Sequence, residues 1–279
     1  MSEKQREFAF TQRDFDFLRT VANQRTGIVV TDEKFDMFYS RLSRRVRALG
    51  LKSFSQYCDV IRTEQDDNEV LELVNAITTN LTSFFRENHH FEYLANTLIP
   101  HLLERNAASR TIRIWSAGCS TGEEPYSLAM TLKESVPTDW KIELLATDID
   151  SNVLAKAASG IYQLERVSGI PKTRLRRWFV KGKGKQAGYV RLKPEVRNMI
   201  KFGQLNLMEG WSMDAKFDVI FCRNVIIYFD KTSKTQLVNR YADSLTGDGH
   251  LFIGHSESLF KVTERFHLIG NTIYQRTGP

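Results

Sequence analysis

The stretch TIRIWSAGCSTGEE, residues 111–124, decides the fold, because an apolar strand runs directly into a glycine turn and then into the start of a helix. The pattern returns at residues 142–158, where the run IELLAT is followed by Asp148, Ile149 and Asp150 and by a second helix. Apolar runs at 198–202, 217–222, 249–254 and 272–276 predict further strands, with a helix near 231–244. Alternating strands and helices predict a mainly parallel sheet covered on both faces.

Residues 174–193 interrupt this alternation. An arginine-rich helical segment leads into two short apolar runs, 178–180 and 189–192, on either side of a glycine-containing turn at 182–188. This spacing predicts a β-hairpin. We therefore expect a small antiparallel β-subdomain, about 174–196, inserted in the α/β domain.

The first 79 residues show apolar side chains at helical spacing and no strand-like alternation. Four helices are expected, and their first residues or N-caps are Thr11, Thr31, Ser53 and Asp67. The second carries an apolar stripe at Phe35, Phe38, Leu42, Val46 and Leu49. We expect a small all-helical N-terminal domain at 1–79, followed by the α/β domain at 80–279, with a linker at 80–90.

The composition is that of an ordinary globular protein, with 42% apolar and 26% charged residues in 279. No run of 18 apolar residues and no secretory signal is visible, so we expect a cytoplasmic protein that does not insert into a membrane. Three widely separated cysteines make a disulfide framework or a zinc site improbable. The net charge of +6 suits an acidic partner, either nucleic acid or protein.

The glycine turn at 116–122 follows the first expected strand, and the acid Asp148 ends the second. In an open parallel sheet this edge binds the ligand, and an acid at the second strand end can accept hydrogen bonds from ribose hydroxyls. Glu123 and Glu124 after the turn disfavour a pyrophosphate and favour a cationic group, such as the sulfonium of S-adenosylmethionine. The alternative is that both acids only stabilise the helix start. Asp150 is expected to be an N-cap.

Five segments in order carry a resemblance to a known family: TNLTSFFRE (79–87), WSAGCSTGEEPYS (115–127), ATDID (146–150), FCRNVIIYFD (221–230) and GHSES (254–258). They closely resemble the CheR family of chemotaxis receptor methyltransferases, and the likeness extends over nearly the whole chain. The resemblance implies a Rossmann-like domain that transfers a methyl group from S-adenosylmethionine to receptor glutamates. The products would be glutamate methyl esters and S-adenosylhomocysteine, and the reaction would adjust receptor signalling during adaptation.

The resemblance also implies the residues of the cofactor site. They are Asn80, Thr82, Arg86, Glu123, Asp148, Asn206, Leu207, Arg223 and Asn224. Arg86 could pair with the cofactor carboxylate or be an ordinary surface arginine. Asn206 and Leu207 are expected to bind and pack the adenine.

Arg223 and Tyr228 are our candidate catalytic residues, both for positioning the substrate. Arg223 would hold or orient the substrate carboxylate, and Tyr228 or Tyr241 would line the acceptor pocket. A purely structural Arg223 would instead need a carboxylate partner. We expect no general base, because a free glutamate is ionised at neutral pH. No metal is implied.

Partner surfaces follow from the same resemblance. Arg41, Arg44, Arg45 and Arg47 lie on one expected helix and would face acidic receptor helices, unless they form only a solvated surface. The inserted β-subdomain could bind a receptor C-terminal pentapeptide as an added strand, or merely support the fold. No nucleic-acid partner is implied, and a monomer is expected.

Three other readings stay open. A nicotinamide-dependent dehydrogenase would have a full Gly-x-Gly-x-x-Gly turn, which is absent after the first strand. A methyltransferase acting on base amino groups typically has Asp/Asn-Pro-Pro-Tyr where this chain has Arg223, Asn224, Val225 and Ile226. A module that only senses S-adenosylmethionine can be excluded only by turnover.

Overall fold

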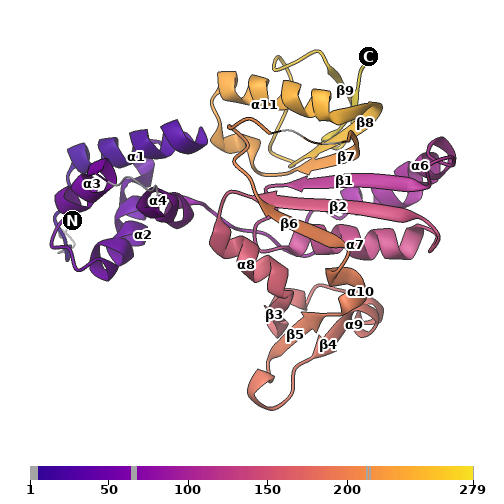
Figure 1. Ribbon diagram of the computed structural model, residues 1–279, viewed down its shortest axis with the longest axis horizontal. Coiled ribbons are helices and arrows are strands. Elements are labelled where there is room, and N and C mark those ends of the chain that lie inside the picture. The colour runs from indigo at the N-terminus through magenta and orange to yellow at the C-terminus, as the bar shows by residue number, and fades with distance from the viewer. Residues whose placement is uncertain (1–5, 64–67, 212, 214, 279) are drawn as a thin grey trace. The chain divides into compact units, whose positions relative to one another are not determined.

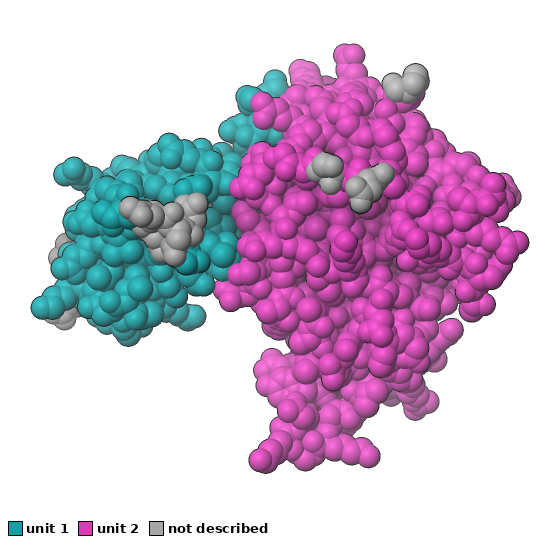
Figure 2. Space-filling view, in the orientation of Figure 1, with its two compact units in different colours: residues 1–79, 228–233 teal, residues 80–227, 234–279 magenta. Residues whose placement is uncertain are grey.

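The computed structural model describes residues 6–63, 68–211, 213 and 215–278. The chain divides into two compact units, coloured separately in Figure 2. One comprises residues 1–79 and 228–233, and the other residues 80–227 and 234–279. Each unit has its own apolar core.

The first unit is helical, as predicted. Its elements are α1 (Gln12–Thr26), the short 3-10 turn η1 (Asp32–Lys34), α2 (Phe35–Ala48), α3 (Phe54–Thr63) and α4 (Asn68–Ile77). The predicted N-cap Thr11 is confirmed, since its hydroxyl accepts from the Asp14 amide at 3.2 Å while the Asp14 carboxylate accepts from the Thr11 amide at 2.9 Å. Thr31 precedes a 3-10 turn without a side-chain capping bond. Asp67, expected to start the fourth helix, lies outside the described residues.

The packing of this unit follows the predicted stripe. Phe38, Leu42 and Val46 of α2 are fully buried, while Leu49 at the helix end is exposed. They pack with Phe15 and Leu18 of α1 in one cluster.

The second unit is built on a seven-stranded sheet with the order β6-β2-β1-β7-β8-β10-β9. Figure 1 shows the strands from β6 at the lower edge up to β8. The strands are β1 (Thr111–Ala117), β2 (Lys141–Asp148), β6 (Ile200–Gln204), β7 (Phe217–Cys222), β8 (Leu245–Ile253), β9 (Phe266–Gly270) and β10 (Ile273–Arg276). The pairs β1–β2, β2–β6, β1–β7 and β7–β8 are parallel, and β10 is antiparallel to both of its neighbours. The predicted, mainly parallel sheet is therefore present.

Helices cover both faces of this sheet. The helical elements that accompany this sheet are α5 (His89–Tyr93), the π-helical turn η2 (Leu94–Leu98), α6 (Ile99–Arg105), α7 (Glu123–Ser135), α8 (Ser151–Ser159), the 3-10 turn η5 (Ile226–Tyr228) and α11 (Lys231–Ser244). Successive residues of β1 point to opposite faces. Ser116 donates to Glu124 of α7 at 2.7 Å, while the ring of Trp115 packs on Tyr241 of α11, with centroids 5.5 Å apart.

A second, three-stranded antiparallel sheet extends beyond α8 (Figure 1). It comprises β3 (Ile161–Gln163), β4 (Phe179–Lys181) and β5 (Tyr189–Leu192), with η3 (Leu164–Val167), α9 (Lys172–Trp178), η4 (Gly184–Gln186) and α10 (Pro194–Arg197) around it. The predicted β4–β5 hairpin is present. The sheet also takes β3, which lies before the expected range of 174–196 and pairs with β5.

Two strands, β3 and β9, were not predicted from the sequence. β3 has three residues, too few to show a period of two. β9 exposes His267, Leu268 and Ile269 in succession at the edge of the large sheet, so it shows no alternation of apolar and polar positions. No helix among the described residues has both the length and the apolar character needed to cross a bilayer.

Candidate functional site

The candidate site lies at the carboxyl ends of the parallel strands. From β1 the chain proceeds to β2 and β6 on one side, and then crosses to β7 and β8 on the other. The switch point between β1 and β7 is where open α/β sheets bind ligands, because the loops after these two strands diverge. The loop after β1 and residues 223–225 after β7 flank this point.

The glycines of the first loop are required by close packing. Gly118 has a φ of +91°, and a Cβ there would lie 2.4 Å from Cγ2 of Val225. Gly122 has a φ of +97°, and its Cβ would lie 2.8 Å from the Cβ of Ala157. Side chains at either position would fill the turn, so the backbone is left bare where the cofactor is expected.

Glu123 and Glu124 open α7, and both already have partners. Glu123 is fully buried, pairs with Arg166 and accepts from the Thr121 hydroxyl at 2.6 Å. Glu124 accepts from Ser116, and Nη1 of Arg223 lies 3.1 Å from its Oε2. Burial raises the pKa of Glu124, and the charge of Arg223 opposes this. These acids therefore fix neighbouring arginines as well as suiting a helix start.

Asp148 ends β2 and is nearly buried. Its carboxylate accepts from the amides of Ser120, at 2.7 Å, and Asp150, at 3.0 Å. Burial raises its pKa, while these backbone hydrogen bonds lower it. Asp150 is the N-cap of α8, accepting from the Asn152 and Val153 amides, which confirms that prediction.

The linker residues reach this edge. The Asn80 amide donates to Asp150 at 2.9 Å, and the Thr82 carbonyl accepts from Arg166 at 2.8 Å. The guanidinium of Arg86 donates to the Leu81 carbonyl at 2.8 Å. Arg166, which the sequence analysis did not single out, thus joins the linker to Glu123.

Asn206 and Leu207 follow β6. The amide of the preceding Leu205 donates to the Asp148 carbonyl at 3.0 Å, which brings this turn to the second strand end. Asn206 donates to Glu209 at 3.0 Å, and Leu207 is buried with its carbonyl accepting from Arg240. The apolar side chain of Leu207 and the side-chain amide of Asn206, next to an acid that can bind ribose hydroxyls, suit an adenosine group.

Arg223 directly follows β7, and its side chain is only 2% exposed. Besides Glu124, its guanidinium lies 3.2 Å from Oε2 of Glu87 and donates to the Arg86 carbonyl. The structure thus supplies two carboxylate partners, which is what a structural role would require. Glu87 also accepts from the ring of His255 at 2.9 Å. Burial raises the pKa of Glu87, but the His255 hydrogen bond and Arg223 outweigh it and bring the pKa to about 2.

Asn224 has a φ of +59°, a conformation held by its surroundings. The buried carboxylate of Glu257 accepts from the amides of Asn224 at 2.9 Å, Ile227 at 3.2 Å and Gly254 at 2.6 Å. A Cβ at Gly254 would lie 2.4 Å from Nδ2 of Asn224. Glu87 and Glu257 stand inside the quoted segments 79–87 and 254–258, yet sequence reasoning gave them no role, because most of their partners are distant in the chain.

Tyr228 and Tyr241, the two candidates for lining the acceptor pocket, lie in different units of the protein. Tyr228 belongs to the unit of residues 1–79, where its carbonyl accepts from the Val29 amide at 2.8 Å. Tyr241 is fully buried between α11 and the sheet, and its hydroxyl donates to Sγ of Cys222 at 3.2 Å. Tyr241 is therefore a core residue.

The four arginines of α2 are mostly held within their own unit. Arg41 donates to the carbonyls of Ile77 at 2.8 Å and Thr78 at 2.6 Å, capping the end of α4. Arg45 makes a two-pronged contact with Glu69, and Arg47 pairs with Glu7. Arg44 is exposed and forms no ion pair with any residue that the structure describes. The basic face is thus narrower than the sequence suggests.

These features define a class. The sheet is doubly wound, and its strand ends carry a glycine turn without side chains, an acid that can bind ribose hydroxyls and several buried carboxylates. Such an α/β domain is suited to an adenosine cofactor with a cationic part. The domain described as "CheR methyltransferase, SAM binding domain" matches residues 80–275, and "CheR methyltransferase, all-alpha domain" matches residues 13–78. The chain belongs to the CheR methyltransferase family.

Relatives agree with this assignment. A chemotaxis protein methyltransferase of Salmonella typhimurium is 45% identical over 90% of this chain and 85% of the relative. That of Escherichia coli is 43% identical over 95% and 91%, and chemotaxis protein methyltransferase 2 of Pseudomonas aeruginosa is 43% identical over 96% and 94%. The chain is an S-adenosylmethionine-dependent methyltransferase, which decides against the dehydrogenase reading.

Proposed function

We propose that the protein transfers the methyl group of S-adenosylmethionine to glutamate side chains of bacterial chemotaxis receptors. The products are glutamate methyl esters and S-adenosylhomocysteine. The proposal rests on the family and on one feature of the structure: Arg223, a buried cation at the switch point, held by Glu87 and Glu124. Nε of this guanidinium is buried and has no hydrogen-bond partner among the described residues, so one N–H remains for an anionic acceptor, whereas an amine would not need it.

The site residues fit the cofactor by their chemistry. We assign Asp148 to the ribose hydroxyls, Asn206 and Leu207 to the adenine and Arg86 to the carboxylate. Asn80, Thr82, Glu123 and Asn224 complete the set, with Glu123 assigned to the cationic portion of the cofactor. When bound, the cofactor supplies an activated methyl group on a sulfonium.

The chain itself has little acid–base work to do. A glutamate with a pKa near ~4.3 is ionised at neutral pH, so the acceptor needs no general base. We assign Arg223 to orienting the acceptor carboxylate, with Tyr228 assisting. Holding the reacting atoms in line and keeping water from the carboxylate then account for the acceleration.

Receptor recognition is assigned to two surfaces. Arg44 and Arg47 are the accessible part of the basic face of α2. Arg41 and Arg45 lie beside them and bind α4 through the Ile77 carbonyl and Glu69. In the three-stranded sheet β5 is central, so β3 and β4 are edges on which an extended receptor pentapeptide can add as a strand. The protein is proposed to act as a cytoplasmic monomer.

The test is transfer of labelled methyl from S-adenosylmethionine to a purified receptor cytoplasmic fragment. Label in the receptor fragment, and none in added DNA or RNA, is expected. Label in nucleic acid would restore the base-methyltransferase reading. Binding of S-adenosylhomocysteine without transfer to any of several receptors would favour the sensor reading.

A further inference from the structure

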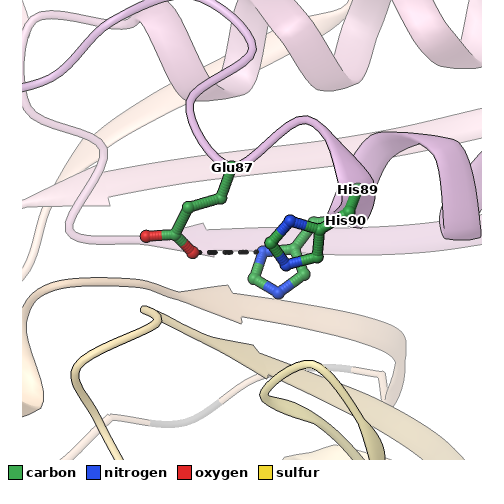
Figure 3. Close-up of side chains that lie close together, drawn as sticks. All are labelled: Glu87, His89 and His90. Atoms are coloured by element: carbon green, nitrogen blue, oxygen red, sulfur yellow. Dashed lines mark ion pairs between the residues drawn. The ribbon is translucent and has the colours of Figure 1, made fainter.

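Three metal-ligating side chains gather where the linker enters α5. Glu87, His89 and His90 each offer a ligand atom, and these atoms lie within 4.8 Å of one another. Figure 3 shows the Glu87 carboxylate directed at the His90 ring, with the His89 ring beside it. Neither histidine is among the residues assigned to the cofactor or the acceptor.

The protonation of His90 can be assigned from its surroundings. Its side chain is fully buried, and Nε2 lies 2.8 Å from the Asn271 carbonyl oxygen. A carbonyl only accepts, so Nε2 carries the proton and Nδ1 presents a bare lone pair. Neutral imidazole is the form that binds metals.

Two buried acceptor atoms therefore face each other. Nδ1 of His90 and Oε2 of Glu87 are 3.5 Å apart, and neither has a hydrogen-bond partner among the described residues. Buried acceptors without a donor are costly. Oε2 also lies 3.2 Å from Nη2 of Arg223, without hydrogen-bond geometry. A cation between Nδ1 and Oε2 would satisfy both atoms.

The spacing and the donor set suit zinc. Two ligands at ~2.0–2.1 Å from a tetrahedral ion are roughly 3.3 Å apart, close to the separation of Nδ1 and Oε2. Two imidazoles with one carboxylate favour zinc and its neighbours over magnesium or calcium. Metal-binding histidines usually donate their second N–H to a carbonyl or carboxylate, as His90 does to Asn271. His89 is partly exposed, which leaves a path to solvent.

We propose that Glu87, His89 and His90 form a binding site for a zinc-like divalent transition-metal ion, with the remaining position open to water. A metal on Oε2 competes with Arg223 for Glu87, so binding loosens one of the two carboxylates that hold Arg223. Metal binding is therefore inhibitory. The inhibitory part rests on the proposed function of Arg223, whereas the binding part does not.

Binding is tested by titrating untagged, chelator-treated full-length protein with Zn²⁺ in a calorimeter, and with Co²⁺ by visible absorption. The wild type should bind one ion and give the strong absorption of four-coordinate Co²⁺. His89→Ala, a change at a partly exposed residue, should weaken Zn²⁺ binding at least tenfold. His267→Ala, an exposed histidine on β9, is the matched control and should bind as the wild type does. Unfolding curves establish that both variants fold.

Equal Zn²⁺ affinity in His89→Ala and the wild type, or no binding by the folded wild type, would overturn the site. The inhibitory part is read separately, from methyl transfer with and without Zn²⁺. Zn²⁺ should slow methyl transfer by the wild type. The same degree of inhibition in His89→Ala should require an at least tenfold higher Zn²⁺ concentration. Binding at the cluster that leaves transfer unchanged would overturn the coupling to Arg223 and leave the proposed methyltransferase function intact.

Discussion

Arg223 and Glu124 form a buried ion pair that joins the end of β7 to the first turn of α7, with Nη1 of the arginine 3.1 Å from Oε2 of the glutamate. The contact crosses the switch point of the sheet, so it fixes the guanidinium where the acceptor carboxylate is expected. Glu124 is in turn held by the hydroxyl of Ser116 at 2.7 Å. The orientation of Arg223 is thus set by β1 and α7 as well as by its own strand.

Glu124→Gln should lower kcat for receptor methylation at least tenfold, because the neutral amide no longer holds Arg223 in one orientation. Removing one partner of a buried pair costs about 3–5 kcal/mol of stability, and we expect the lower end because Glu87 remains. Steady-state kinetics and urea unfolding measure the two effects. Asp139→Asn, which breaks an exposed pair with Arg110, is the control. A folded Glu124→Gln enzyme with wild-type kcat would contradict this role.

Gly118→Ala should weaken S-adenosylhomocysteine binding at least tenfold. The added Cβ would lie 2.4 Å from Cγ2 of Val225, and the φ of +91° disfavours any side chain. The turn must therefore shift, and with it the backbone expected to approach the cofactor. Gly169→Ala introduces a Cβ that meets nothing within 4 Å and should leave the affinity unchanged. Calorimetric titration decides, and equal affinities for the two variants would refute the packing argument.

Glu257→Ala should destabilise the protein by on the order of 3 kcal/mol, because three backbone N–H groups lose their acceptor. Those amides set the loop that carries Asn224, so cofactor affinity should fall as well. Glu257→Gln keeps one acceptor oxygen, so its stability and cofactor affinity should lie between those of the wild type and Glu257→Ala. Chemical unfolding and cofactor titration measure the series. Full stability in Glu257→Ala would show that water replaces the carboxylate without cost.

His250 should make stability fall in mild acid. Burial lowers its pKa from 6.5 to about 4 in the folded chain. The unfolded chain therefore takes up the proton first, and stability is lost as pH falls from 6.5 towards 4, by at most about 1.4 kcal/mol per pH unit. His250→Gln should reduce this pH dependence of stability without abolishing it, because burial also lowers the pKa of His90. Urea midpoints at constant ionic strength test this, and identical slopes would contradict it.

The sequence predicted features that depend on neighbours in the chain. The Thr11 and Asp150 caps are local patterns, because a side chain accepts from an amide two or three residues ahead. The parallel sheet followed from alternating strand and helix segments. Its switch point followed from the glycine turn after β1 and the acid at the end of β2.

Contacts between distant residues were beyond that reasoning. Arg223 meets Glu87 across 136 positions and Glu124 across 99 positions, and no local pattern signals either pair. The arginines of α2 illustrate the opposite error: four cations within two turns suggest a free basic face, but Arg45 is taken by Glu69 of another helix. Burial and pairing are decided by tertiary packing.

The most direct test of the proposed reaction is the stability of the methylated product to mild base. After transfer from methyl-labelled S-adenosylmethionine to a receptor cytoplasmic fragment, brief base treatment should release the label as methanol, because a carboxyl methyl ester is hydrolysed. Label that stays on the receptor through this treatment would place the methyl group on nitrogen and contradict the proposal that glutamate carboxylates are the acceptors.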